Sequence, residues 1–256
     1  MLQVEWLKLK RYRPFWLLLL FYPISLVTTL LISMQVWQTS TKAGVPTNLL
    51  IQGSPWAFPG VWHSVCYMAS FFHFFPCMLV ILITANEFEF KTHRQNLLDG
   101  WTRAQFFGAK LVVTGLVLLI CWSCVALVAV GCGLSQKSYQ IWEGLPQFGF
   151  FALQSTLYAA LALGLAFWMR RGLLAMALFT AYSTVLEGML GFFVRNQTVK
   201  HYLPLASAHQ LLPFPGEVAK KFATQVPPAP ALMAAAAFYI VLFLGVSWRH
   251  FQKQDL

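Results

Sequence analysis

The chain has 256 residues, of which 58% are hydrophobic and only 10% are charged, whereas about a quarter of the residues in an ordinary soluble domain carry charge. This composition excludes a soluble globular domain. The net charge of +10 does not indicate nucleic-acid binding, because the Lys and Arg residues gather at the ends of apolar runs instead of forming one basic tract.

The first thirteen residues have the pattern of an amphipathic helix lying on a membrane surface. Leu2, Trp6 and Leu9 share one helical face, and Glu5 and Lys8 point elsewhere. A simple basic flank of the first membrane span is the alternative interpretation. Residues 1–13 are therefore expected to form an interfacial helix.

Six apolar stretches follow, each long enough for a transmembrane helix, which needs about 20 apolar residues. They predict an all-α integral membrane protein with six transmembrane helices in a single permease-like domain spanning residues 1–256. The predicted spans are 14–36, 61–85, 111–134, 148–169, 173–194 and 231–248.

The basic residues predict the orientation. Twelve of the 18 Lys and Arg residues flank the spans on one side, and six lie in the opposite loops, spread over more residues. The first set is Lys8, Lys10, Arg11, Arg13, Lys91, Arg94, Arg103, Lys110, Arg170, Arg171, Arg249 and Lys253. Since cytoplasmic loops are enriched in Lys and Arg, both termini are expected in the cytoplasm of a multi-pass protein of the plasma or inner membrane.

The segment 86–110, between the second and third spans, mixes acidic and basic residues as no other part of the chain does. Glu87, Lys91 and Arg94 recur at i, i+4 and i+7, which predicts a ladder of charges on one face of a helix that continues from span two. Gly100 suits the left-handed position after a helix end, and Thr102-x-x-Gln105 matches a capping box that starts the next helix. The expected structure is a helix, a sharp turn and a helix protruding on the cytoplasmic side; an ordinary solvated loop is the alternative.

The external segment 195–230 is long for a connector, which is typical of a functional or disordered loop. Leu205, Leu211 and Leu212 are apolar enough to enter the outer leaflet, and Pro204 and Pro213 divide any helix into short pieces. A re-entrant segment and a surface loop both fit this pattern.

Ionisable side chains lie inside predicted spans, and two of them matter most here. Glu187 belongs to span five and His73 to span two, and both are candidates for a substrate pathway because ionisable groups in a membrane are costly. A carboxyl group bonded to a neighbouring helix and a buried neutral histidine are the plainer interpretations. Cys121 and Cys124, at i, i+3 in span three, lack a second ligand pair at matching spacing, so no metal site is predicted.

The elbow segment resembles that of a known family. The order Asn86-Glu87, Thr92, Arg94, Gly100, Arg103 and Lys110 is similar to the cytoplasmic segment between the second and third helices of small ABC-2 type permeases, also called type V or G-type exporters. The resemblance extends to chain length, six-span topology, the N-terminal helix and the long external loop before span six.

The resemblance implies a permease subunit that is not itself an enzyme. It implies a second permease copy, as a homodimer or a related heterodimer, together with two copies of an ABC ATPase that hold ATP and Mg, in contact with membrane lipid and without nucleic acid. No G-x-x-x-x-G-K-[ST] phosphate loop occurs in the chain, so ATP hydrolysis is expected in the separate subunit and no cofactor in this one. The residues implied in ATPase coupling are Glu87, Glu89, Lys91, Thr92, Arg94, Gly100, Arg103 and Lys110.

Two rival functions remain open at this point. One is a secondary transporter or channel that needs no ATPase. The other is an intramembrane metal-dependent hydrolase built from Glu87, Glu89, His73 and His93, although Glu87 and Glu89 fall on different helix faces. The substrate of an exporter is not identified by the sequence; the aromatic-rich spans are compatible with an amphiphile.

Overall fold

The computed structural model describes residues 10, 12–44, 54–194, 197–214 and 227–253. Within these residues all regular secondary structure is helical. The predicted interfacial helix, residues 1–13, falls almost entirely outside the described residues. The all-helical prediction is confirmed for the part of the chain that is described.

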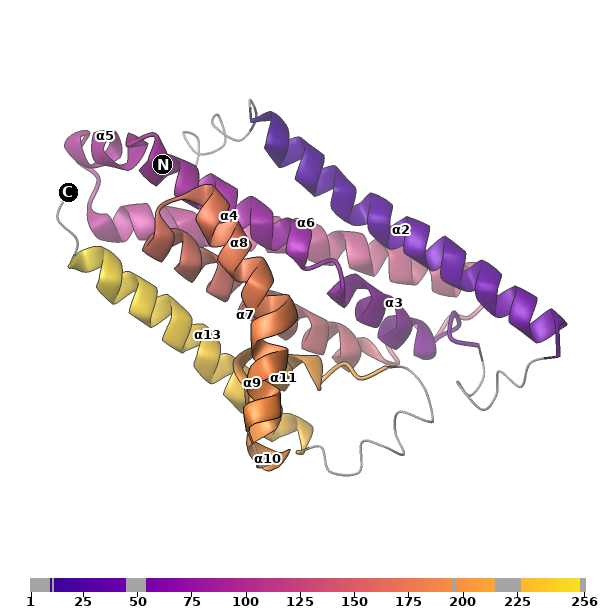
Figure 1. Ribbon diagram of the computed structural model, residues 1–256. Helices are drawn as coiled ribbons and strands as arrows, with labels where there is room; N and C mark the ends of the chain where they lie inside the picture. The colour runs from indigo at the N-terminus through magenta and orange to yellow at the C-terminus, as the bar shows by residue number, and fades with distance from the viewer. Residues whose placement is uncertain (1–9, 11, 45–53, 195–196, 215–226, 254–256) are drawn as a thin grey trace.

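The long helices lie side by side in one elongated bundle (Figure 1). Five of them are long and apolar enough to cross a membrane, and a sixth crossing results if α3 and α4, which are bent by 47° relative to each other, form one span. A multi-pass membrane protein is therefore what the helices indicate. The described helices are α2 (Arg13–Lys42), α3 (Gly60–Ser70), α4 (Phe74–Glu89), α5 (Thr92–Leu98), α6 (Arg103–Ser135), α7 (Leu145–Met169), α8 (Gly172–Ala181), the π-helix η2 (Tyr182–Leu186), α9 (Glu187–Phe193), α10 (Gln197–Lys200), α11 (Pro204–His209) and α13 (Ala229–Gln252).

The break between α3 and α4 was not anticipated from the sequence, and Pro76 explains it. Proline has no N–H to donate, and in a continuous helix its ring would clash with the carbonyl group of Phe72, four residues earlier. The chain instead passes through tighter turns, in which the Phe72 N–H bonds to the Ala69 carbonyl at 3.0 Å and the Phe75 N–H to the Phe72 carbonyl at 3.2 Å. Span two is consequently a bent pair of helices.

Helix α7 is the centre of the bundle. It contacts α3, α4, α6, α8, α11 and α13, and its residues from Leu157 to Phe167 are all buried. Small side chains permit the close approach, as is common between membrane helices. At Gly164 a Cβ atom would come within 2.9 Å of the Ser247 Oγ atom of α13.

The helices run alternately between two ends of the bundle. We call the end that carries α5 the elbow end and the other the far end. Tyr12, just before α2, accepts a hydrogen bond from the Asn86 amide nitrogen of α4 at 2.8 Å, and Arg103, at the start of α6, donates to the Gln252 carbonyl oxygen at the end of α13. The start of α2 and the end of α13 therefore lie together at the elbow end (Figure 1).

The segment after α9 is packed into the bundle. Helix α11 contacts α7 and α13, and Leu205, Ala208, Leu211 and Leu212 are buried. The prolines do divide this region into short helices, since Pro204 is the first residue of α11. Residues 204–212 are thus covered by α7 and α13.

The close contact at Gly164 yields a stability prediction. Gly164→Leu should force α7 and α13 apart and lower the free energy of unfolding by about 1–3 kcal/mol, the usual cost of overpacking. Gly149→Leu, in the same helix, is the matched control because a Cβ atom at Gly149 meets nothing within 4 Å. The measurement is thermal unfolding of both purified variants in detergent; equal melting temperatures would contradict the packing argument.

Candidate functional site

The elbow consists of residues 90–102, which connect α4 to α6 through α5. The predicted continuous helix is wrong: α4 ends at Glu89, and Lys91 has a left-handed φ of 57°. Because the helix is interrupted there, Glu87, Lys91 and Arg94 do not form a ladder on one face. Lys91 and Arg94 are exposed, whereas Glu87 is buried.

Side chains of α5 explain why α4 ends at this point. The backbone carbonyl oxygen of Glu87 accepts hydrogen bonds from the His93 Nδ1 atom at 2.9 Å and from the Thr92 hydroxyl at 3.4 Å. These bonds occupy an acceptor that the next turn of α4 would otherwise use. Helix α5 therefore folds back over the end of α4.

The side chain of Glu87 forms a buried salt bridge with Lys110 of α6. The Lys110 Nζ atom lies 2.8 Å from the Glu87 Oε1 atom, and the two side chains are 1% and 8% exposed. The ammonium group also lies 5.5 Å from the centroid of the Phe106 ring, a cation–π distance. This pair joins the helices that enter and leave the elbow.

Four phenylalanines from four candidate spans pack beneath the elbow. Phe88, Phe106, Phe167 and Phe251 come from α4, α6, α7 and α13, and all six of their ring-centroid distances fall between 5.3 and 6.5 Å. Such separations suit edge-to-face and offset aromatic contacts. The elbow is thus held on a rigid aromatic base, which we call the phenylalanine cluster.

The turn at Gly100 and the start of α6 are as predicted. Gly100 has a φ of 93°, and the Trp101 N–H donates to the Asn96 carbonyl oxygen at 3.1 Å, the bond that marks a Schellman motif. Thr102 and Gln105 form the reciprocal hydrogen bonds of a capping box, 3.2 and 2.9 Å long. Both local signals were readable from the sequence because they depend on neighbouring residues alone.

The outer surface of the elbow combines charge with exposed apolar side chains. Phe90 is 73% exposed and Leu98 is 88% exposed. Glu89, Lys91 and Arg94 surround them and are exposed as well. Of the residues predicted for coupling, the structure therefore brings Glu87, Thr92, Arg103 and Lys110 into the support of the elbow and leaves Glu89, Lys91, Arg94 and Gly100 on its surface.

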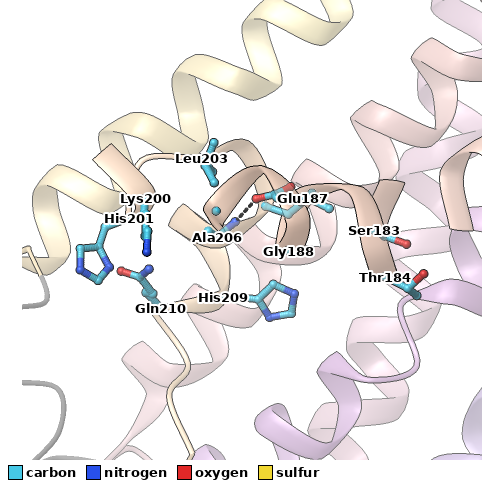
Figure 2. Close-up of a pocket in the computed structure, with 12 residues that line it drawn as sticks. Ser183, Thr184, Glu187, Gly188, Lys200, His201, Leu203, Ala206, His209 and Gln210 are labelled. Carbon is cyan, nitrogen blue, oxygen red and sulfur yellow. Dashed lines mark hydrogen bonds between the residues drawn. The ribbon is translucent and has the colours of Figure 1, made fainter. Parts of the chain in front are cut away.

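A second candidate site is a cavity of about 450 Å³ next to Glu187 (Figure 2). It lies between span five, formed here by η2 and α9, and the segment that contains α10 and α11. Its lining residues are Ser183, Thr184, Glu187, Gly188, Gly191, Lys200, His201, Leu203, Leu205, Ala206, His209 and Gln210.

Glu187 anchors α11 to span five. The Ala206 N–H donates to the Glu187 Oε1 atom at 2.6 Å, and the Leu205 amide and the Tyr182 hydroxyl also contact this carboxyl group. Leu203 occupies the N-cap position of α11, and its side chain cannot accept a hydrogen bond. Glu187 therefore accepts from N–H groups of the first turn, which have no partner within the helix. This is the plainer of the two interpretations of Glu187, and it accounts for one of its two oxygens.

The π-helix directs Glu187 toward α11. The Glu187 N–H donates to the Tyr182 carbonyl oxygen five residues earlier, and this wider turn changes which face of the helix the following residues occupy. Single π-turns within α-helices are frequent at functional sites. The sequence carried no signal for this turn.

His73 does not line the cavity, although it lies near it. Its ring is buried and stacks on Phe151 and Tyr158 of α7 at 5.1 Å each, while its Nδ1–H donates to the Ser70 carbonyl oxygen at 2.6 Å. Tyr158 in turn bonds to His209, which does line the cavity. Tyr158 and His209 thus link His73 to the lining of the cavity that also contains Glu187.

The sequence analysis missed the polar contact between α7 and α11. The Gln154 amide nitrogen lies 3.1 Å from His209 Nδ1; because an amide nitrogen only donates, Nδ1 accepts, and the Nε2–H of a neutral imidazole bonds to the Tyr158 oxygen. Gln154 and Tyr158 are polar groups at i, i+4 in a span whose other residues are apolar apart from Ser155 and Thr156. That spacing was the available signal.

The ligand set of the hydrolase hypothesis does not come together. Among the described residues no group of three or more His, Cys, Asp or Glu side chains is arranged to hold a metal ion. Glu87 is paired with Lys110, His93 bonds to backbone, and His73 stacks against α7. Glu87, His93 and His73 therefore have separate partners and do not face a common point where a metal ion could bind.

The bundle and its two sites define a multi-pass helical membrane protein. The chain belongs to the family described as "Protein of unknown function (DUF2705)", whose model matches residues 26–256. A comparison with curated proteins gives no match.

The salt bridge beneath the elbow can be tested by a double-mutant cycle. Lys110→Met should remove the α6 partner of the buried Glu87 carboxyl group and cost about 3–5 kcal/mol, whereas Glu87→Gln combined with Lys110→Met should recover much of that loss. Thermal unfolding and membrane yield of the two single variants and the double variant give the coupling energy. Additive effects of the two changes would show that the pair does not act as a unit.

Proposed function

We propose that this chain is the transmembrane permease subunit of an ATP-binding cassette exporter of the ABC-2 type. Two permease copies would assemble with two copies of a separate ABC ATPase and move an amphiphilic substrate across the membrane. The ATPase would hold ATP and Mg and drive the cycle, and this chain would provide the pathway and the docking surface.

The observation that carries this proposal is the construction of the elbow. A coupling element must be exposed to its partner and fixed to the spans that it moves. The outer surface offers exposed apolar groups, Phe90 and Leu98, among exposed charges, the combination found in the anchors and rims of protein interfaces. The inner surface is fastened by the Glu87–Lys110 pair and the phenylalanine cluster.

The same contacts suggest how force would reach the membrane. Helix α5 contacts both α4 and α6, and α4 contacts the central helix α7. A push on α5 would therefore move spans two and three together, and through the phenylalanine cluster it would reach α7 and α13. Packed interfaces of this kind transmit displacements because close-packed side chains deform little.

The proposal predicts separate roles for the surface and the support of the elbow. Arg94→Glu and Leu98→Asp should abolish ATPase association while the membrane domain keeps its thermal stability, because both side chains are exposed. Loss of a central apolar anchor typically costs about 2 kcal/mol or more of binding free energy. Gly100→Val should also uncouple the subunits, since valine disfavours the positive φ of this turn. Co-purification with the ATPase and substrate-stimulated ATP turnover measure both effects.

The matched control is Lys42→Glu, which reverses an exposed charge at the far end and should leave association unchanged. Glu87 is not suitable for a docking test because its substitution disturbs the fold. Normal association in Arg94→Glu, Leu98→Asp and Gly100→Val would reject coupling through the elbow. An intact chain that transports without any ATPase would favour the secondary transporter or channel.

A further inference from the structure

The cavity beside Glu187 has the dimensions of a ligand site. Its volume of about 450 Å³ lies within the range of roughly 300–1,000 Å³ typical of small-molecule pockets. The first wall is span five from Ser183 to Gly191, and the second is the packed segment from Lys200 to Gln210. Since α11 is anchored by the Glu187 carboxyl group, the second wall is fixed to the first.

Three buried polar atoms on this lining have no hydrogen-bond partner among the described residues. They are Glu187 Oε2, His201 Nδ1 and Gln210 Oε1. Glu187 is only 7% exposed, and none of the three atoms has solvent contact that could replace the missing partner. Buried polar groups are normally satisfied, and small rotations of these lining side chains would present the three atoms to a ligand with matching hydrogen-bonding groups.

The charges of the lining are separated. Figure 2 shows Glu187 between the hydroxyl side chains of Ser183 and Thr184 on one side and Lys200, His201 and Gln210 on the other. The carboxyl group suits an amine, and an amine bound there would itself favour the carboxylate form. Lys200 and His201 suit an acidic group of the same ligand.

The surroundings of the cavity are apolar. Met189, Phe192 and Phe193 of α9 are 51%, 89% and 81% exposed. The same helix contributes Gly188 and Gly191 to the cavity lining, and neither has a side chain that would fill the cavity. At Gly188 a Cβ atom would meet nothing within 4 Å. A hydrocarbon tail can therefore lie along α9 while a polar head enters the cavity.

We propose that this cavity binds the head group of a zwitterionic amphiphile, with its amine at Glu187, its acidic group at Lys200 and His201, and its tail along α9. As the entry site of a transported substrate, the cavity rests on the proposed exporter function. As a binding site, it belongs to this chain alone and needs no ATPase.

The test is native mass spectrometry of the purified chain in neutral maltoside micelles, with lysophosphatidylethanolamine and lysophosphatidylglycerol as probes. The two probes share the phosphate and the single tail but differ in the amine. The wild-type chain should bind the ethanolamine probe about tenfold more tightly, the ratio that corresponds to about 1.4 kcal/mol. Glu187→Gln keeps an oxygen that can accept from Ala206 but lacks the charge, so it should bring the ratio to about one without loss of thermal stability.

Two further variants test whether the cavity itself is the site. Gly188→Leu should fill the space next to Glu187 and weaken both probes, whereas Gly115→Leu, another helical glycine with nothing within 4 Å of a Cβ atom, should bind like the wild type. A wild-type ratio near one, an unchanged ratio in Glu187→Gln or unchanged binding in Gly188→Leu would each overturn the proposal.

Failure of this inference and failure of the exporter function can be told apart. ATPase association with normal coupling, but without a Glu187-dependent preference for the amine, would reject only the head-group site. Amine-selective binding in a chain that never associates with an ATPase would leave the site in place and reject only the exporter.

Discussion

The elbow depends on one buried contact, the salt bridge between Glu87 and Lys110. Two charges removed from water are costly unless each compensates the other, so α4 and α6 must approach at a fixed depth and rotation for the pair to form. The 2.8 Å separation and the low exposure of both side chains show that this condition is met. Their position beside Phe106 connects the pair to the phenylalanine cluster and hence to α7 and α13. By fixing α4 relative to α6, the salt bridge thus also fixes the position of α5, which contacts both helices.

The far half of the bundle uses a carboxyl group differently. Glu187 stabilises the first turn of a short helix that has no capping side chain of its own, and it does so from another span. One oxygen accepts the Ala206 N–H, and the second is buried without a hydrogen-bond partner among the described residues. An anchoring residue can therefore also recognise a ligand, because the anchor fixes the geometry of the remaining oxygen. The two interpretations of Glu187 offered by the sequence are compatible for this reason.

The central helix α7 joins these two regions. Its Ala and Gly residues allow close contact with α13 at Gly164, and its polar residues Gln154 and Tyr158 bond to His209 of α11. The Phe167 ring at its other end belongs to the phenylalanine cluster. In the proposed exporter, a displacement of the elbow would reach the cavity through this helix.

The sequence by itself determined the features that arise from local composition. Long apolar runs predicted a helical membrane protein, because the hydrocarbon core contains no water and a helix satisfies its backbone N–H and C=O groups internally. Gly100 and the Thr102–Gln105 pair were predicted correctly, because a left-handed turn and a capping box involve only near neighbours. The tertiary structure decided the partners of the charged groups. The i, i+4 spacing placed Glu87 on one helical face with Lys91, yet Glu87 pairs with Lys110, since Thr92 and His93 end the helix and packing brings α6 within reach. Glu187 and His209 likewise line the same cavity because of a π-turn in span five and the packing of α11 against the bundle. No local sequence pattern encodes such contacts between distant residues.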